Sequence, residues 1–160
     1  MLRYTYSNPN DNIVFLQKIM SKINNLVIEC EMWAVGSLML VPKYNGDYPP
    51  SGESNCNEIA FNFMKRVERE RIAYVSFEDI QRIFQDTECI REGVFICFPK
   101  LTHYNYDFFP VADVENVEEL QHPFALVEVR VIDGDILEIL SKEQSTIEQI
   151  REMLDILNDQ

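Results

Sequence analysis

The clearest alternation of hydrophobic and polar residues in this chain lies near its carboxyl end. Between residues 127 and 131, three valines alternate with one glutamate and one arginine, and this period of two indicates a half-buried β-strand. Asp133-Gly134 follows, where glycine can take the positive φ of a tight turn. Residues 136–140 then supply a return strand, so this stretch predicts a β-hairpin.

The length of the turn decides which residues of the hairpin face inward. A two-residue turn would pair Val129 with Glu138, whereas a three-residue turn keeps the three valines on one face with Leu137 and Ile139. One buried face fixes the register, because a shift of one residue moves the whole hydrophobic set. We therefore expect the three-residue turn. The outer face mixes charged and apolar residues, which predicts that another segment covers part of it. Its residues are Glu128, Arg130, Ile132, Ile136, Glu138 and Leu140.

Helical spacing of apolar residues predicts four helices. The first follows Asn8-Pro9 and ends near residue 25, and the last runs from about residue 144 towards the carboxyl end. Residues 58–70 fit either a strand or a helix, but their length and charged run favour a helix. The helix at 77–84 should begin with a capping box made by Ser76 and Asp79.

Strands are expected at residues 2–6, 26–33, 35–41, 72–75 and 93–98, with a turn at Gly36 between the second and third. The last is apolar throughout, which indicates a central strand covered on both faces. No linker or repeat divides the chain. The prediction is one α+β domain over residues 1–160, with a mainly antiparallel sheet, helices packed on one face and a C-terminal helix.

The charge of the chain is strongly negative and uneven. The formal net charge is -13, and residues 81–160 contribute most of it. An acidic field repels phosphate backbones and anionic lipids, so neither nucleic acid nor a membrane surface is an expected partner. A basic protein partner would instead be attracted, whereas a plain solubilising role for the acidity is the simpler alternative.

Four cysteines, Cys30, Cys56, Cys89 and Cys97, lack the C-x-x-C spacing of metal sites. The first residues lack the apolar run of a signal peptide. We therefore expect reduced, structurally inert thiols in a soluble cytoplasmic protein, with no metal and no cofactor.

Aromatic and acidic residues are concentrated between residues 101 and 119. Aromatic side chains with polar tips are enriched in protein interfaces, and the neighbouring carboxylates would attract a basic partner. The alternative is that the rings pack under the sheet. The candidate binding residues are Tyr104, Tyr106, Asp107, Phe109, Asp113, Glu115, Glu118 and Glu119.

A polar site for a small molecule or an enzymatic reaction is the second possibility. His103 near Asp107 could act as an acid–base pair, and the breaker-rich stretch 42–57 could add side chains to the site. An exposed loop is the simpler interpretation of that stretch. Its candidate residues are Tyr44, Asp47 and Tyr48.

Catalytic motifs are absent from the sequence. It contains no G-x-S-x-G elbow, no H-E-x-x-H and no phosphate-binding loop, which favours binding over catalysis. A Cys–His nucleophile would need the fold to bring a cysteine beside His103 or His122. In size and charge alone, the chain resembles bacterial immunity or inhibitor proteins, which implies a protein-binding module acting on a basic partner. The sequence does not specify the oligomeric state.

Overall fold

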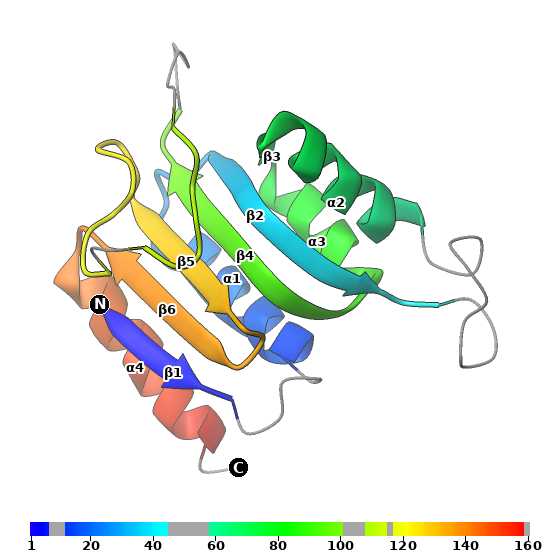
Figure 1. The fold of residues 1–160 in the computed structure, drawn as a ribbon. Coiled ribbons are helices and arrows are strands. Elements are labelled where there is room, and N and C mark those ends of the chain that lie inside the picture. The colour runs from blue at the N-terminus through cyan, green and yellow to red at the C-terminus, as the bar shows by residue number, and fades with distance from the viewer. Residues whose placement is uncertain (7–11, 45–57, 101–107, 115–116, 159–160) are drawn as a thin grey trace.

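The computed structural model describes residues 1–6, 12–44, 58–100, 108–114 and 117–158. Its centre is one antiparallel sheet with the strand order β1-β6-β5-β4-β2-β3 (Figure 1). The strands are β1 (Leu2–Thr5), β2 (Met32–Pro42), β3 (Ile72–Val75), β4 (Thr87–Phe98), β5 (Val127–Ile132) and β6 (Ile136–Ser141). The helices are α1 (Asn12–Leu26), α2 (Glu58–Glu70), α3 (Phe77–Gln85) and α4 (Gln144–Asn158).

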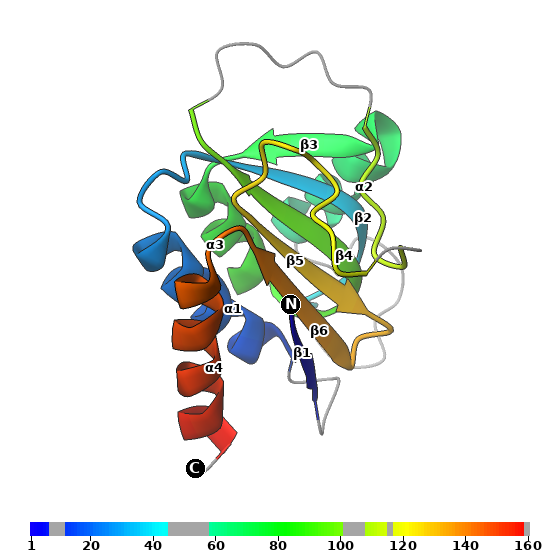
Figure 2. The same ribbon diagram turned by 90° about the vertical axis from the view of Figure 1, so that its left-hand side faces the viewer.

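The helices pack on one face of the sheet, as Figure 2 shows most clearly for α1, α3 and α4. Buried residues of all four helices join the inward residues of the strands in one hydrophobic core. The α+β prediction, with an antiparallel sheet, helices on one face and a C-terminal helix, is therefore confirmed. The sequence also identified the apolar side of α1, since Leu16, Ile19 and Ile23 are fully buried.

The β5–β6 hairpin has the predicted three-residue turn. Ile132 pairs with Ile136, and Val129 pairs with Ile139. Asp133 and Gly134 both have positive φ, at 52° and 78°. The hydrophobic pattern therefore fixed the register correctly, because only this pairing buries the three valines together.

Three other local predictions are also confirmed. Residues 58–70 are helical, and the Ser76–Asp79 capping box is present at the start of α3. Strand β4 lies between β5 and β2, with its residues from 93 to 98 buried. The proposed cap at Asn8 lies outside the described residues.

The prediction of two strands separated by a turn at Gly36 is wrong. One strand, β2, runs through this position, and the chain turns earlier, around residues 28–29. Gly36 is needed for another reason: a Cβ atom there would lie 2.4 Å from Cγ of Pro110. The glycine lets a distant segment approach the strand closely. In the sequence, a glycine with this role cannot be distinguished from a glycine in a turn.

The expectation of reduced thiols throughout is also wrong, because Cys30 and Cys97 form a disulfide. The two residues are separated by 67 positions in sequence, yet their Cα atoms lie 5.7 Å apart. Glu31 donates a backbone hydrogen bond to Phe98, which holds the chain beside the end of β4. Spacing along the chain carries no information on a pairing that the sheet creates. Cys89 is buried and free.

Alkylation of the unfolded, unreduced protein should therefore leave Cys30 and Cys97 unmodified and label Cys89. Thiols react with alkylating reagents and disulfide sulfurs do not, so peptide mass spectrometry shows which cysteines are oxidised, and the mass of the linked peptide pair identifies the partners. A sample reduced before alkylation is the control and should be labelled at both positions. Equal labelling of Cys30 with and without reduction would contradict the disulfide.

Candidate functional site

The face of the sheet opposite the helices is covered by residues 108–114 and 117–126 of one segment. In Figure 1 these residues cross in front of the sheet. Ala112 and Ala125 pack with Val94, Ile96 and Phe98 of β4 in a second, smaller hydrophobic cluster. The predicted cover over the outer face is therefore present, and it buries charged residues that the sequence suggested would face outward.

Three charged residues lie buried under this cover. Glu128 and Arg130 are 0 % exposed and Glu138 is 1 % exposed. Nε of Arg130 lies 2.6 Å from a carboxylate oxygen of Glu128, and Nη1 lies 3.5 Å from Glu138. Arg3 reaches Glu138 from the edge strand at 3.6 Å. The cluster is thus electrically balanced, with two carboxylates facing two guanidinium groups.

Arg130 also fixes the covering segment to the sheet. Its two terminal nitrogens donate hydrogen bonds to the carbonyl oxygens of Val117 at 2.9 Å and Glu119 at 2.8 Å. Donors on a planar guanidinium hold their acceptors in one geometry. The buried charge therefore determines where the backbone around residues 117–119 lies.

Gln121 closes the same segment into a loop. Its side-chain amide accepts a hydrogen bond from the Val111 amide at 2.8 Å and donates one to the Val111 carbonyl at 2.9 Å. Its backbone amide donates to Glu128 at 2.8 Å, and its side chain also donates to that carboxylate. We call the described residues of this stretch, 111–114 and 117–121, the acidic loop. It is fixed at both ends, and Arg130 holds it in the middle.

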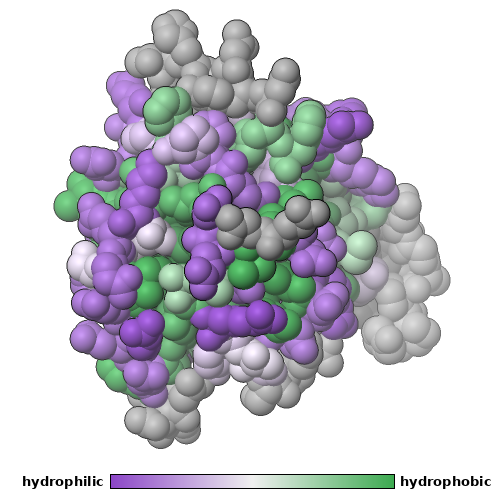
Figure 3. Space-filling view, turned by 60° about the vertical axis from the view of Figure 1, so that its left-hand side comes forward, coloured by the Kyte–Doolittle hydropathy of each residue, from purple (hydrophilic) through white to green (hydrophobic). Residues whose placement is uncertain are grey.

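The carboxylates of the acidic loop point to solvent. Asp113, Glu118 and Glu119 are exposed, and none of them forms an ion pair with a described residue. The balanced cluster beneath them leaves their negative charge uncompensated. Figure 3, which brings forward the side carrying β1 and β6, shows hydrophilic residues spread widely, with smaller apolar areas between them.

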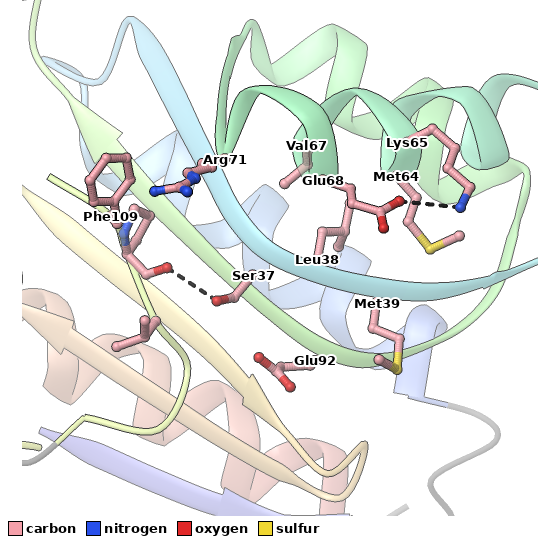
Figure 4. Close-up of a pocket in the computed structure, with 12 residues that line it drawn as sticks. Ser37, Leu38, Met39, Met64, Lys65, Val67, Glu68, Arg71, Glu92 and Phe109 are labelled. Atoms are coloured by element: carbon pink, nitrogen blue, oxygen red, sulfur yellow. Dashed lines mark hydrogen bonds and ion pairs between the residues drawn. The ribbon is translucent and has the colours of Figure 1, made fainter. Parts of the chain in front are cut away.

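A groove of about 640 Å³ lies beside the start of the acidic loop. It is bounded by α2, by the middle of β2 and by residues 109–111, as Figure 4 shows. We call it the α2 groove. Its lining is mainly apolar, with two charged side chains from α2 and one each from the residue after α2 and from β4. The lining residues are Ser37, Leu38, Met39, Met64, Lys65, Val67, Glu68, Arg71, Glu92, Phe109, Pro110 and Val111.

The floor of the α2 groove is an irregular part of β2. The pairing of β2 with β4 shifts register between Gly36 and Met39, and Ser37 has a φ of 47°. The Ser37 hydroxyl donates a 3.1 Å hydrogen bond to the carbonyl of Pro110. Together with the close approach of Pro110 to Gly36, this bond fixes the wall formed by residues 109–111.

The candidate binding residues separate into three groups. Asp113, Glu118 and Glu119 are brought together on the acidic loop, and Phe109 lies at its border in the α2 groove, 57 % exposed. Tyr44 is exposed just beyond the end of β2 and does not line the groove. The remaining candidates lie outside the described residues: Asp47, Tyr48, His103, Tyr104, Tyr106, Asp107 and Glu115.

The histidine that the structure describes is a packing residue. His122 is 2 % exposed, and its ring lies against Phe98 at 4.9 Å and Phe108 at 4.7 Å. Burial, with a contribution from Lys142, lowers the pKa of His122. Its Nδ1 accepts a hydrogen bond from the amide of Phe124, which holds the neutral ring in place.

No cysteine in the described part of the chain pairs with His122 as a nucleophile. Cys97 is in the disulfide. Cys89 lies on the same strand as Phe98 but roughly 30 Å away from it, at ~3.3 Å per residue. Among the described residues, no group of three or more His, Cys, Asp or Glu side chains could hold a metal ion.

Comparison of the chain with protein-family models, with curated proteins and with solved structures gives no match. A function is therefore inferred from the geometry of the acidic loop and the α2 groove.

Proposed function

We propose that this protein is a protein-binding module that uses the acidic loop to bind a basic partner, in the manner of an inhibitor or immunity protein. The observation that carries the proposal is the fixed position of the loop. Gln121 closes it and Arg130 holds its backbone from below. A loop that is already ordered loses less conformational entropy on binding than a free one.

Electrostatics supports a basic partner for the loop. The net charge of -13 attracts cationic proteins at long range. Asp113, Glu118 and Glu119 add a local field that is not neutralised by neighbouring described cations. Exposed charges of this kind mainly raise the association rate and lose their effect with salt, because screening acts over about 8 Å at physiological ionic strength.

Phe109 supports an anchoring role next to the acidic loop. Its ring is 57 % exposed, although a phenylalanine normally gains from burial. Aromatic side chains that become buried on binding often carry a large share of the binding free energy. In this proposal, the carboxylates set the association rate and Phe109 slows dissociation.

A cytoplasmic location belongs to the same proposal, as does the lack of nucleic-acid and membrane partners. No helix among the described residues is long and apolar enough to cross a bilayer. The Cys30–Cys97 disulfide is the observation against a cytoplasmic location, since disulfides persist mainly in oxidising compartments.

Charge reversal of the loop tests the proposal. The protein with Glu118→Lys and Glu119→Lys should associate with its partner about tenfold more slowly or worse, because a steering field of one sign is replaced by its opposite. The immobilised protein is first used to capture its partner from native-cell lysate at low and high salt. Once the captured protein is identified, its association and dissociation rates are measured with the parent and the variant.

The matched control is Glu152→Lys with Asp155→Lys. These exposed residues lie on α4, on the opposite face of the sheet, and the change in net charge is the same. The control should bind the captured protein like the parent. Equal weakening by both variants would point to net charge alone, and a partner that binds equally at both salt concentrations would refute electrostatic recognition.

A further inference from the structure

The α2 groove is a second candidate binding site because of the backbone conformation of two residues that line it. Three non-glycine residues have positive φ in the described part of the chain: Ser37, Arg71 and Asp133. Asp133 lies in the hairpin turn, where such a φ is expected. The other two both line the α2 groove. Backbone held in this region by its surroundings is concentrated at functional sites in proteins.

Arg71 is the cation of this groove that is available to a ligand. It follows the last residue of α2 with a φ of 66°, a position where glycine is the usual residue. The other basic residues of α2 are paired with carboxylates of the helix. Lys65 pairs with Glu68, and Arg66 and Arg69 both pair with Glu70. Arg71 forms no ion pair with a described residue.

The Arg71 guanidinium lies 5.1 Å from the centroid of the Phe109 ring. Figure 4 shows the side chain extended from the end of α2 towards this ring. A guanidinium stacked over an aromatic ring keeps its in-plane N–H donors free, and two of them match the two oxygens of a carboxylate. The stacking also holds the side chain in place before a ligand arrives.

The rest of the groove suits an apolar group attached to that carboxylate. Leu38, Met39, Met64, Val67 and Val111 supply most of the non-polar lining. Methionine side chains are flexible and polarisable, so they adapt to ligands of different shape. The volume of about 640 Å³ lies within the range of ~300–1,000 Å³ found for small-molecule sites.

Glu92 limits the ligand to one negative charge. It lies on β4 opposite Met39 of the β2 bulge and lines the same groove as Arg71. A second carboxylate on the ligand would approach this side chain and be repelled. From these features we propose that the α2 groove binds a small amphipathic monocarboxylate, with its carboxylate on Arg71 and its apolar chain over the methionines.

The test uses decanoate, decanol and decylamine, which share one apolar chain and differ in the charge of the head. Titration calorimetry on the full chain should give the order decanoate tighter than decanol and decylamine. Amide NMR shifts with decanoate should map to the groove, around residues 37–39, 64–71 and 109–111. Equal affinity for decanol, or tighter binding of decylamine, would overturn the proposal.

Substitution of Arg71 is the decisive comparison. Arg71→Gln should weaken decanoate binding about tenfold or more, the loss expected for hydrogen bonds to a charged group. Arg82→Gln is the matched control, since it removes one exposed arginine of α3 that pairs with Glu78. Unchanged binding in Arg71→Gln, or an equal loss in Arg82→Gln, would refute the role of Arg71.

Arg71→Gly separates recognition from folding. Glycine is favoured at positive φ, so this variant should melt at the parental temperature or above it and still lose decanoate. A variant that melts higher and keeps decanoate would remove Arg71 from the site. The loop variant Glu118→Lys with Glu119→Lys should keep decanoate binding, so failure of this site and failure of the partner proposal are distinguishable.

Discussion

Arg130→Ala is expected to lose about 3–5 kcal/mol of folding free energy, the range for removing one partner of a buried ion pair. The substitution leaves Glu128 and Glu138 buried without their main cation. It also removes the donors to the carbonyl groups of Val117 and Glu119. Chemical denaturation followed by circular dichroism gives the free energy, and amide NMR shows whether the acidic loop keeps its order.

Arg82→Ala is the matched control for this prediction. Arg82 pairs with Glu78 at 2.7 Å on the surface of α3, and exposed pairs of this kind contribute about 0–1 kcal/mol. Both variants remove one positive charge, so the difference between their losses of folding free energy measures the effect of burial. A loss below 1 kcal/mol for Arg130→Ala would show that the cluster under the acidic loop contributes little to stability.

Val129→Asp is expected to prevent folding. Val129 is 0 % exposed and lies on β5 between Phe95 and Ile139 of the neighbouring strands. The change gives up about 1.5–3 kcal/mol of apolar burial. It also costs about 4 kcal/mol or more to bury the carboxyl group, which corresponds to a pKa raised by 3–5 units. These losses are comparable with the total stability of a typical domain.

The same substitution at an exposed valine is the control. Val14 on α1 is 56 % exposed, and an aspartate in the first turn of a helix is favourable. Val14→Asp should therefore give soluble protein with a parental melting curve, whereas Val129→Asp should be found in the insoluble fraction. Soluble Val129→Asp with a parental melting curve would disprove the assigned core of the sheet.

The parts of the fold that could be predicted are those in which local pattern and tertiary environment agree. The β5–β6 hairpin could be predicted because its valines alternate with charged residues and its turn contains Gly134. The start of helix α3 could be predicted because Ser76 and Asp79 have the spacing of a capping box, which the structure contains. In both cases the residues that give the signal lie within a few positions of one another.

Long-range contacts account for the parts that could not be predicted. From the sequence Gly36 was predicted to be a turn residue, yet it is needed because Pro110 packs too closely against the strand for a Cβ atom. Cys30 and Cys97 were predicted to be small apolar residues with free thiols. The pairing of β2 with β4 brings them together as a disulfide. Glu128 reads as solvent-exposed, because nothing near it in sequence shows that the acidic loop covers it.

The candidate sites were predicted only in part for the same reason. The acidic residues after position 113 and the exposed ring of Phe109 were identified from composition. Arg71 was not, because its importance depends on a positive φ and on a ring that lies far along the chain. Gln121 was also missed, since its bonds to Val111 and Glu128 exist only after folding. The apolar residues Ile132, Ile136 and Leu140 among the charges of the outer face were the signal that predicted a cover.

The Cys30–Cys97 bond divides the chain into a covalent ring and two tails. The ring contains β2, α2, β3, α3 and most of β4, whereas β1 with α1 and β5 with β6 and α4 lie outside it. After a single backbone cleavage inside the ring, the two fragments therefore stay covalently joined through the disulfide. The acidic loop lies in a tail, so a cleavage there would give two fragments that separate under denaturing conditions even without reducing agent.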